Sequence, residues 1–191
     1  MSKGRLEAFS DGVMAIIITI MVLELAPPRG ATLDDLRGLG PIFVSYVLSF
    51  VNVGMYWNNH HHLFQAAKAV DGNVLWANLH LLFWLSLFPF VTGWMGENAF
   101  AAVPVAVYGV VAAMAGFAYF ILSQVLIRAQ PAGAPLAEAI GGDTKGKISI
   151  ALYLVAIPLA LIAAWAAFAI FVVVAVIWFV PDRRIERTLG R

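Results

Sequence analysis

The sequence predicts an all-α membrane protein with six transmembrane helices. Of its 191 residues, 62% are hydrophobic and only 12% are charged, and its mean hydropathy is +0.86. Soluble domains carry about 25% charged residues, and a spanning helix needs about 20 mostly apolar residues. Apolar runs of roughly this length predict spans over residues 6–25, 41–62, 73–95, 101–127, 148–163 and 165–181, forming one transmembrane domain over residues 1–191. The formal net charge of +1 gives no support for nucleic-acid binding.

Proline, glycine and charged residues separate the first four spans. The first span ends before Pro27-Pro28, which cannot continue a helix, and Pro41 suits the beginning of the second. The third and fourth are separated by a turn at residues 96–98. Residues 128–147, rich in Gln, Pro, Gly and charge, are expected to form an extramembrane loop.

The run from 148 to 180 is too long for one ordinary span and short for two. Basic residues flank it on both sides: Lys145, Lys147, Arg183, Arg184, Arg187 and Arg191. The positive-inside rule places both groups in the cytoplasm, which requires two short helices that turn at residues 163–165. The amino and carboxyl termini then both face the cytoplasm, and the only basic residues in the outer loops are Arg29 and Arg37.

The first span carries ionisable residues, which are costly in a membrane and usually functional. At 100° per residue, one narrow stripe holds Phe9, Ile16, Ile20 and Leu23, with Thr19 and Gly12 on its flank. Asp11 lies almost opposite and is expected to face other helices of its own subunit. The simpler alternative is that the stripe packs against lipid or another helix, while the Thr19 hydroxyl bonds a carbonyl one turn earlier.

A polar cluster ends the second span, with three consecutive histidines at residues 60–62. Neighbours on a helix point about 100° apart, so these side chains cannot converge on one metal ion. No structural metal or cofactor is therefore expected. We expect one buried histidine, with His60 paired to Asp11 as one possibility, while Asn78 in the third span is expected to bond between helices.

These motifs resemble the transmembrane protein 175 family of endosomal and lysosomal type potassium channels. Arg-x-x-x-Phe-Ser-Asp is matched by residues 5–11, Trp-x-x-His-x-x-Leu-Phe by residues 57–64, and the later Asn-Leu and Phe-Pro pairs by residues 78–79 and 88–89. The resemblance covers the first three spans by motif and the last three only by hydropathy.

The resemblance implies six helices per repeat and, for a single-repeat chain in a prokaryotic cell membrane, a homotetramer whose first helices line a central pore. Ile16 would form the apolar constriction, Ile20 and Leu23 the residues farther outward, and Thr19 the threonine tied to selectivity. An interhelical network would include Arg5, Phe9, Ser10, Asp11, Trp57, His60 and Asn78. The helical repeat of 100° per residue instead places Arg5 near the stripe that would face the pore.

The sequence therefore predicts a potassium-preferring cation channel with a hydrophobic constriction, in which potassium passes Ile16 and Thr19, with lipid and other copies of the chain as partners. One alternative is a proton-coupled carrier that uses Asp11 and His60 as a titrating relay. Another is a metal-dependent hydrolase built on His60, His62 and His80. An enzyme is not expected, because no nucleophile motif or glutamate base accompanies these histidines.

Overall fold

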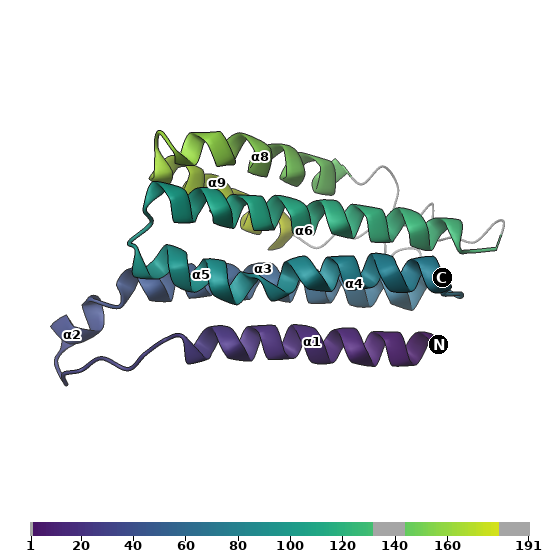
Figure 1. Ribbon diagram of the computed structural model, residues 1–191, viewed down its shortest axis with the longest axis horizontal. Coiled ribbons are helices and arrows are strands. Elements are labelled where there is room, and N and C mark those ends of the chain that lie inside the picture. Colours follow the sequence, from purple (N-terminus) through teal and green to yellow (C-terminus); the bar gives the residue numbers. More distant parts are fainter. Residues whose placement is uncertain (1, 132–143, 180–191) are drawn as a thin grey trace.

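The computed structural model is all-helical across the residues it describes, 2–131 and 144–179. The longer helices lie side by side in an elongated bundle, and short α2 projects beyond one end (Figure 1). The helices are α1 (Lys3–Leu23), α2 (Leu33–Arg37), α3 (Gly40–Ala66), α4 (Gly72–Ser86), α5 (Phe88–Glu97), α6 (Ala102–Arg128), α8 (Thr144–Ala160) and α9 (Ala164–Phe179). The basic tail predicted from residue 183 onward lies outside the described residues.

Within the part of the chain that the structure describes, four helical segments are long and apolar enough to cross a bilayer: α1, α3, the α4–α5 pair and α6. Helix α9 is apolar between Ala164 and Trp178 but shorter. The chain is therefore a multi-pass membrane protein. Helix ends differ from the predicted spans by a few residues, as where α3 continues to Ala66, because hydropathy marks only the hydrocarbon-crossing part of a longer helix.

The third span is divided at Leu87, which ends α4 and precedes α5. Pro89 occupies the first turn of α5, where a missing backbone N–H costs nothing within the helix. Close packing then fixes α5 on α3. A Cβ at Gly96 would lie 2.8 Å from the Ile42 Cα and 2.5 Å from the Ser45 Oγ, so only glycine fits this contact.

Helix α1 lies at the edge of the bundle, where it packs against α3, α4 and α5 (Figure 1). Helix α6 packs against α4, α5, α8 and α9. The buried side of α1 includes Leu6, Met14, Ile17 and Met21. Because the described helices cover only this side, the opposite face of α1 is open within residues 2–131 and 144–179.

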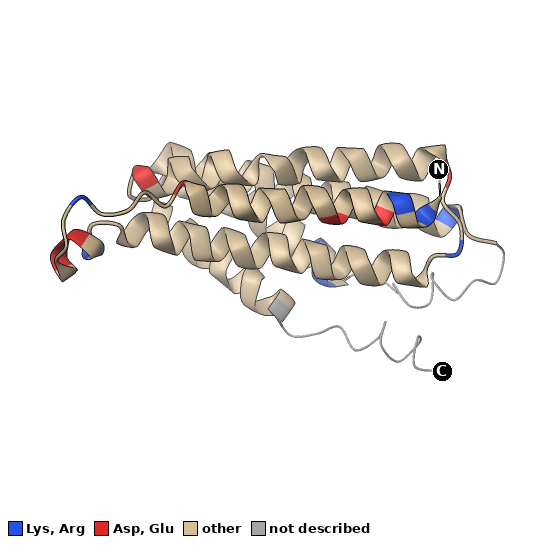
Figure 2. Ribbon diagram, turned by 90° about the horizontal axis from the view of Figure 1, so that it is seen from below, with Lys and Arg blue, Asp and Glu red and all other residues tan. Residues whose placement is uncertain are grey.

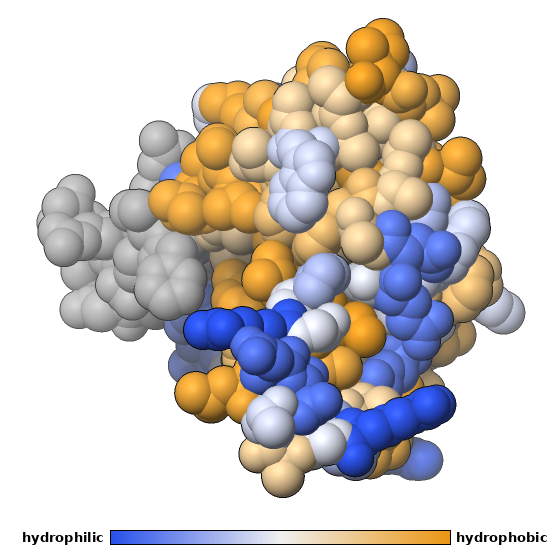
Figure 3. Space-filling model, turned by 90° about the vertical axis from the view of Figure 1, so that its left-hand side faces the viewer, coloured by the Kyte–Doolittle hydropathy of each residue, from blue (hydrophilic) through white to orange (hydrophobic). Residues whose placement is uncertain are grey.

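Charge separates the two ends of the bundle. Most of the described Lys and Arg residues lie toward the end that holds the N-terminus, whereas the α2 end carries several Asp and Glu residues (Figure 2). Seen from the α2 end, hydrophilic residues gather near the tip and hydrophobic residues cover much of the flanks (Figure 3). Polar ends and apolar flanks are the distribution that a bilayer requires.

Two polar side chains, Lys3 and Gln130, connect helices at the basic end. The Lys3 Nζ donates to the Ala67 carbonyl at 2.9 Å, which ties the beginning of α1 to the end of α3. The Gln130 amide oxygen accepts from the backbone N–H groups of Lys68 and Ala69, and its nitrogen donates to the carbonyls of Ala69 and Leu126. The α3–α4 connection is thereby held to the end of α6.

Candidate functional site

The open face of α1 carries an apolar stripe. The exposed fractions are 58% for Ile16, 43% for Ile20 and 80% for Leu23, whereas Ile17 on the opposite face is 4% exposed. Large apolar side chains therefore extend outward from the chain along nearly two turns of α1. This stripe, defined by Ile16, Ile20 and Leu23, is where the sequence predicts a pore.

Thr19 interrupts the stripe with an exposed hydroxyl. Its Oγ1 donates to the Ile16 carbonyl at 3.0 Å, which is the local hydrogen bond that the simpler interpretation anticipates. Since the proton is used within the helix, the lone pairs of the oxygen remain available on the open face. The residue therefore offers an acceptor there, which is the type of group a cation can contact.

Behind the stripe, a buried chain of hydrogen bonds joins α1, α4 and α3. The Asn78 Nδ2 donates to the Ser10 Oγ at 2.9 Å, and the Asn78 Oδ1 lies 2.8 Å from the His60 Nε2. An amide oxygen can only accept, so Nε2 must carry the imidazole proton. All three residues are buried, at 0% exposure for Ser10 and Asn78 and 1% for His60.

Asp11 has a separate partner. The Trp57 Nε1 donates to the Asp11 Oδ1 at 3.0 Å, and the Trp57 ring stacks on His61. The suggested pairing of His60 with Asp11 is therefore not formed, and His60 binds Asn78 instead. Ser10 and Asp11 are neighbours on α1 and point about 100° apart, so one is directed at α4 and the other at α3.

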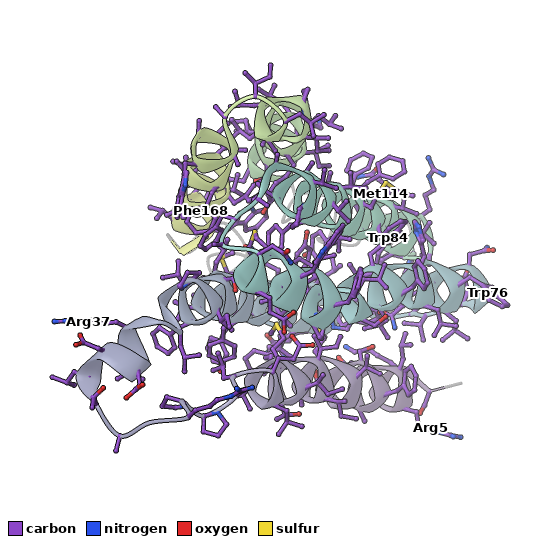
Figure 4. The ribbon with its side chains drawn as sticks, turned by 60° about the vertical axis from the view of Figure 1, so that its left-hand side comes forward. Arg5, Arg37, Trp76, Trp84, Met114 and Phe168 are labelled. Atoms are coloured by element: carbon purple, nitrogen blue, oxygen red, sulfur yellow. The ribbon has the colours of Figure 1, made fainter. Side chains whose placement is uncertain are left out.

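Arg5 and Phe9 lie apart from these hydrogen bonds. Phe9 is 50% exposed, and Arg5 points away from the other helices (Figure 4). Both continue the open face of α1 toward the N-terminus, as the helical wheel indicates for Arg5. Of the seven residues expected in the network, the structure brings together Ser10, His60 and Asn78 in one group and Asp11 and Trp57 in another.

A second buried polar group was missed by the sequence interpretation. The Tyr108 hydroxyl of α6 accepts from the Ser49 Oγ at 3.1 Å and from the Asn52 Nδ2 at 2.9 Å, both on α3. The Thr92 Oγ1 of α5 donates to the Ser49 Oγ at 2.6 Å and lies 3.9 Å from the Met21 Sδ of α1. Isolated Ser, Asn and Thr residues within apolar spans are the signal that was available.

The histidines do not form a metal centre. Within residues 2–131 and 144–179, no three His, Asp or Glu side chains are placed to hold an ion together. His80 instead accepts a hydrogen bond from the Trp84 Nε1 at 3.0 Å. The hydrolase alternative has no site in this part of the chain.

One carboxylate lies just beyond the last residue of α1. The Oε2 of Glu24 is buried and has no hydrogen-bond partner among the described residues. A Cβ on Gly93 would come within 2.7 Å of this oxygen, so the glycine makes room for it. Burial, and then the negative charge of Glu97, raise the pKa of Glu24.

The comparisons with known proteins agree with these motifs. A family model described as endosomal/lysosomal potassium channel TMEM175 matches residues 5–89. A protein of Chryseobacterium sp. named potassium channel HX13_20290 is 52% identical over 99% of this chain and 98% of that protein. The endosomal/lysosomal proton channel TMEM175 of Gallus gallus is 41% identical over 34% of this chain and 15% of that protein.

A solved structure shares the fold. The crystal structure of a lysosomal potassium-selective channel TMEM175 homolog from Chamaesiphon minutus superposes with a TM-score of 0.80 and 28% identity, covering 92% of this chain and 95% of that one. These proteins are ion channels and not enzymes. Full-length similarity to a potassium channel, together with the matching motifs and fold, shows that the chain belongs to the TMEM175 family of cation channels.

Proposed function

We propose that the protein is a potassium-preferring channel in which four copies surround a central pore lined by α1. The open stripe on α1 carries this proposal. The opposite side of α1 is buried by helices of the same chain, while Ile16, Ile20 and Leu23 extend outward and no described helix covers them. Four copies related by rotation would direct four such stripes at a common axis.

The narrowest point of this pore is a ring of four Ile16 side chains. Rings of apolar side chains gate by excluding water, so a small outward rotation of α1 would admit water and ions. Ile20 and Leu23 would continue the apolar wall toward the outer side. The Thr19 oxygen, with its lone pairs on the same face, would replace part of the hydration shell of a potassium ion near Ile16.

The buried hydrogen bonds would set the position of α1. Ser10 is held by Asn78 on α4 and Asp11 by Trp57 on α3, so the two contacts fix the rotation of α1 about its own axis. His60 orients the Asn78 amide. Arg5 and Phe9 would line the inner mouth of the pore, because both lie on the open face.

The topology that fits this channel has six spans in the cell membrane and both termini in the cytoplasm. Helices α8 and α9 would be the two short spans, with their turn at residues 161–163. The concentration of Lys and Arg at the N-terminal end supports a cytoplasmic location for that end.

The carrier alternative lacks comparable support. A relay between Asp11 and His60 needs a hydrogen-bonded path, whereas each has its own partner and the Asn78 amide is not a titrating group. Because the Gallus gallus relative is named a proton channel, flux driven by a proton gradient should be measured beside potassium and sodium currents.

Reconstituted protein should give unitary currents that reverse toward the potassium potential under opposed potassium and sodium gradients. Ile16→Asn is expected to increase conductance and reduce the preference for potassium, since an amide wets the ring. The matched control is Leu154→Asn on α8, where the side chain is also exposed, at 57%. If Ile16→Asn has the same conductance and ion preference as the control, the proposed ring of Ile16 side chains is wrong. Flux that occurs only under a proton gradient would favour the carrier.

A further inference from the structure

A groove between α4 and α6 lies at the basic end of the bundle. The groove is open to the surroundings and has a volume of about 590 Å³, with Asp71, Asn73 and Trp76 on one wall and Ile121, Val125 and Arg128 on the other. Helix α6 packs against both α4 and α8, and the residues that line the groove include none of α1. The groove is therefore separate from the open stripe of the proposed pore.

Two opposite charges meet in this groove without pairing. Arg128 is the last residue of α6 and is exposed, and within the described residues the structure records no ion pair for it or for Asp71. The Asp71 Oδ1 accepts from the Val74 backbone N–H at 2.9 Å as the N-cap of α4. Its second oxygen takes part in no hydrogen bond recorded among these residues.

The groove is charged at one end and becomes apolar toward the middle of the bundle. Trp76 is 75% exposed and points away from the bundle (Figure 4). It lies just over one turn beyond Asp71, and exposed tryptophan is typical of the membrane interface. Ile121 and Val125 are one turn apart on α6 and lead from Arg128 toward the middle of the bundle. The order is thus two opposite charges that do not pair, an interfacial indole and then an apolar wall.

We propose that this groove binds a phospholipid with a primary ammonium headgroup, such as phosphatidylethanolamine. The guanidinium of Arg128 binds the phosphate, for which its forked donors are suited. The ammonium group donates to the free oxygen of Asp71, and an acyl chain lies along Ile121 and Val125. A headgroup that carries both charges matches this site better than an anionic one, because the phosphate alone would leave Asp71 facing a negative charge.

The test is lipid binding by the purified full-length protein in detergent, measured by native mass spectrometry and by the lipid-dependent rise in Tm. Phosphatidylethanolamine should bind more tightly than phosphatidylcholine, whose quaternary ammonium has no N–H, and more tightly than phosphatidylglycerol. Arg128→Gln should weaken binding of phosphatidylethanolamine at least about tenfold, the expected loss for a charge-assisted hydrogen bond. Asp71→Asn should reduce it to the level of phosphatidylcholine.

Two features of the variants control for structural damage and for the general loss of charge. Asparagine is as good an N-cap as aspartate, so Asp71→Asn removes the charge and keeps the helix cap. Arg37→Gln makes the same charge change at the opposite end of the bundle and should leave lipid binding unchanged. Equal binding of the three lipids, or full binding by Arg128→Gln, would overturn the proposal. So would an equal rise in Tm with soluble phosphoethanolamine, since the acyl chain would then contribute nothing.

Discussion

Replacing Asn78 with leucine should lower the stability of the folded chain and remove a contact that holds α1 against α4. The substitution removes two buried hydrogen bonds, to Ser10 and to His60, while keeping a side chain of similar size. Interhelical hydrogen bonds in membrane proteins contribute about 0.6 kcal/mol on average and up to about 1.7. The buried His60 N–H is also left without a partner. We therefore expect the free energy of unfolding to fall by about 1–3 kcal/mol.

The assay is reversible unfolding in mixed micelles followed by circular dichroism, with Asn58→Leu as the matched control. Asn58 is an exposed residue of α3, so its loss should change stability little. A double-mutant cycle with Ser10→Ala should give a coupling free energy of about 0.6 kcal/mol. If Asn78→Leu matches the control, or if the coupling is zero, the buried chain does not hold α1.

Three further substitutions test the helix packing, the buried Tyr108 group and the carboxylate of Glu24. Gly96→Ala should lower the free energy of unfolding by about 1–3 kcal/mol, because the added Cβ would collide with α3. The control is Gly54→Ala, whose Cβ would meet nothing within 4 Å and should not destabilise the protein. Thermal unfolding compares the two variants. Tyr108→Phe should cost about 1–3 kcal/mol in the same assay, because two buried donors lose their acceptor, and an unchanged Tm would contradict this. Glu24→Gln should raise the Tm at neutral pH and not at pH 4. A raised pKa means that the folded protein favours protonated Glu24, so stability falls as the pH rises above the ordinary glutamate value; an equal effect at both pH values would contradict the sign.

The membrane class and the residues of the first helix could be predicted from local sequence. Apolar runs predict spans because each spanning helix must satisfy its own backbone hydrogen bonds, so composition over about 20 residues carries the information. Helical periodicity likewise places Ile16, Ile20 and Leu23 on one face and Asp11 on another, as the structure has them. That the stripe lines a pore stays a prediction, because one subunit shows an open face and no partner.

Contacts between helices depended on the tertiary structure. Periodicity gives the direction of a side chain but not the rotation and height of the neighbouring helix. Sequence could not tell that His60 meets Asn78 instead of Asp11. For the same reason Tyr108, one aromatic residue in an apolar span, gave no sign that it accepts hydrogen bonds from Ser49 and Asn52. Local sequence was enough to predict which residues enter the membrane and which faces they share, because both follow from the helix repeat and from the cost of polar groups in lipid. Only the packing of the helices decided which polar groups become partners, since a hydrogen bond requires two atoms within about 3 Å from segments far apart in the chain.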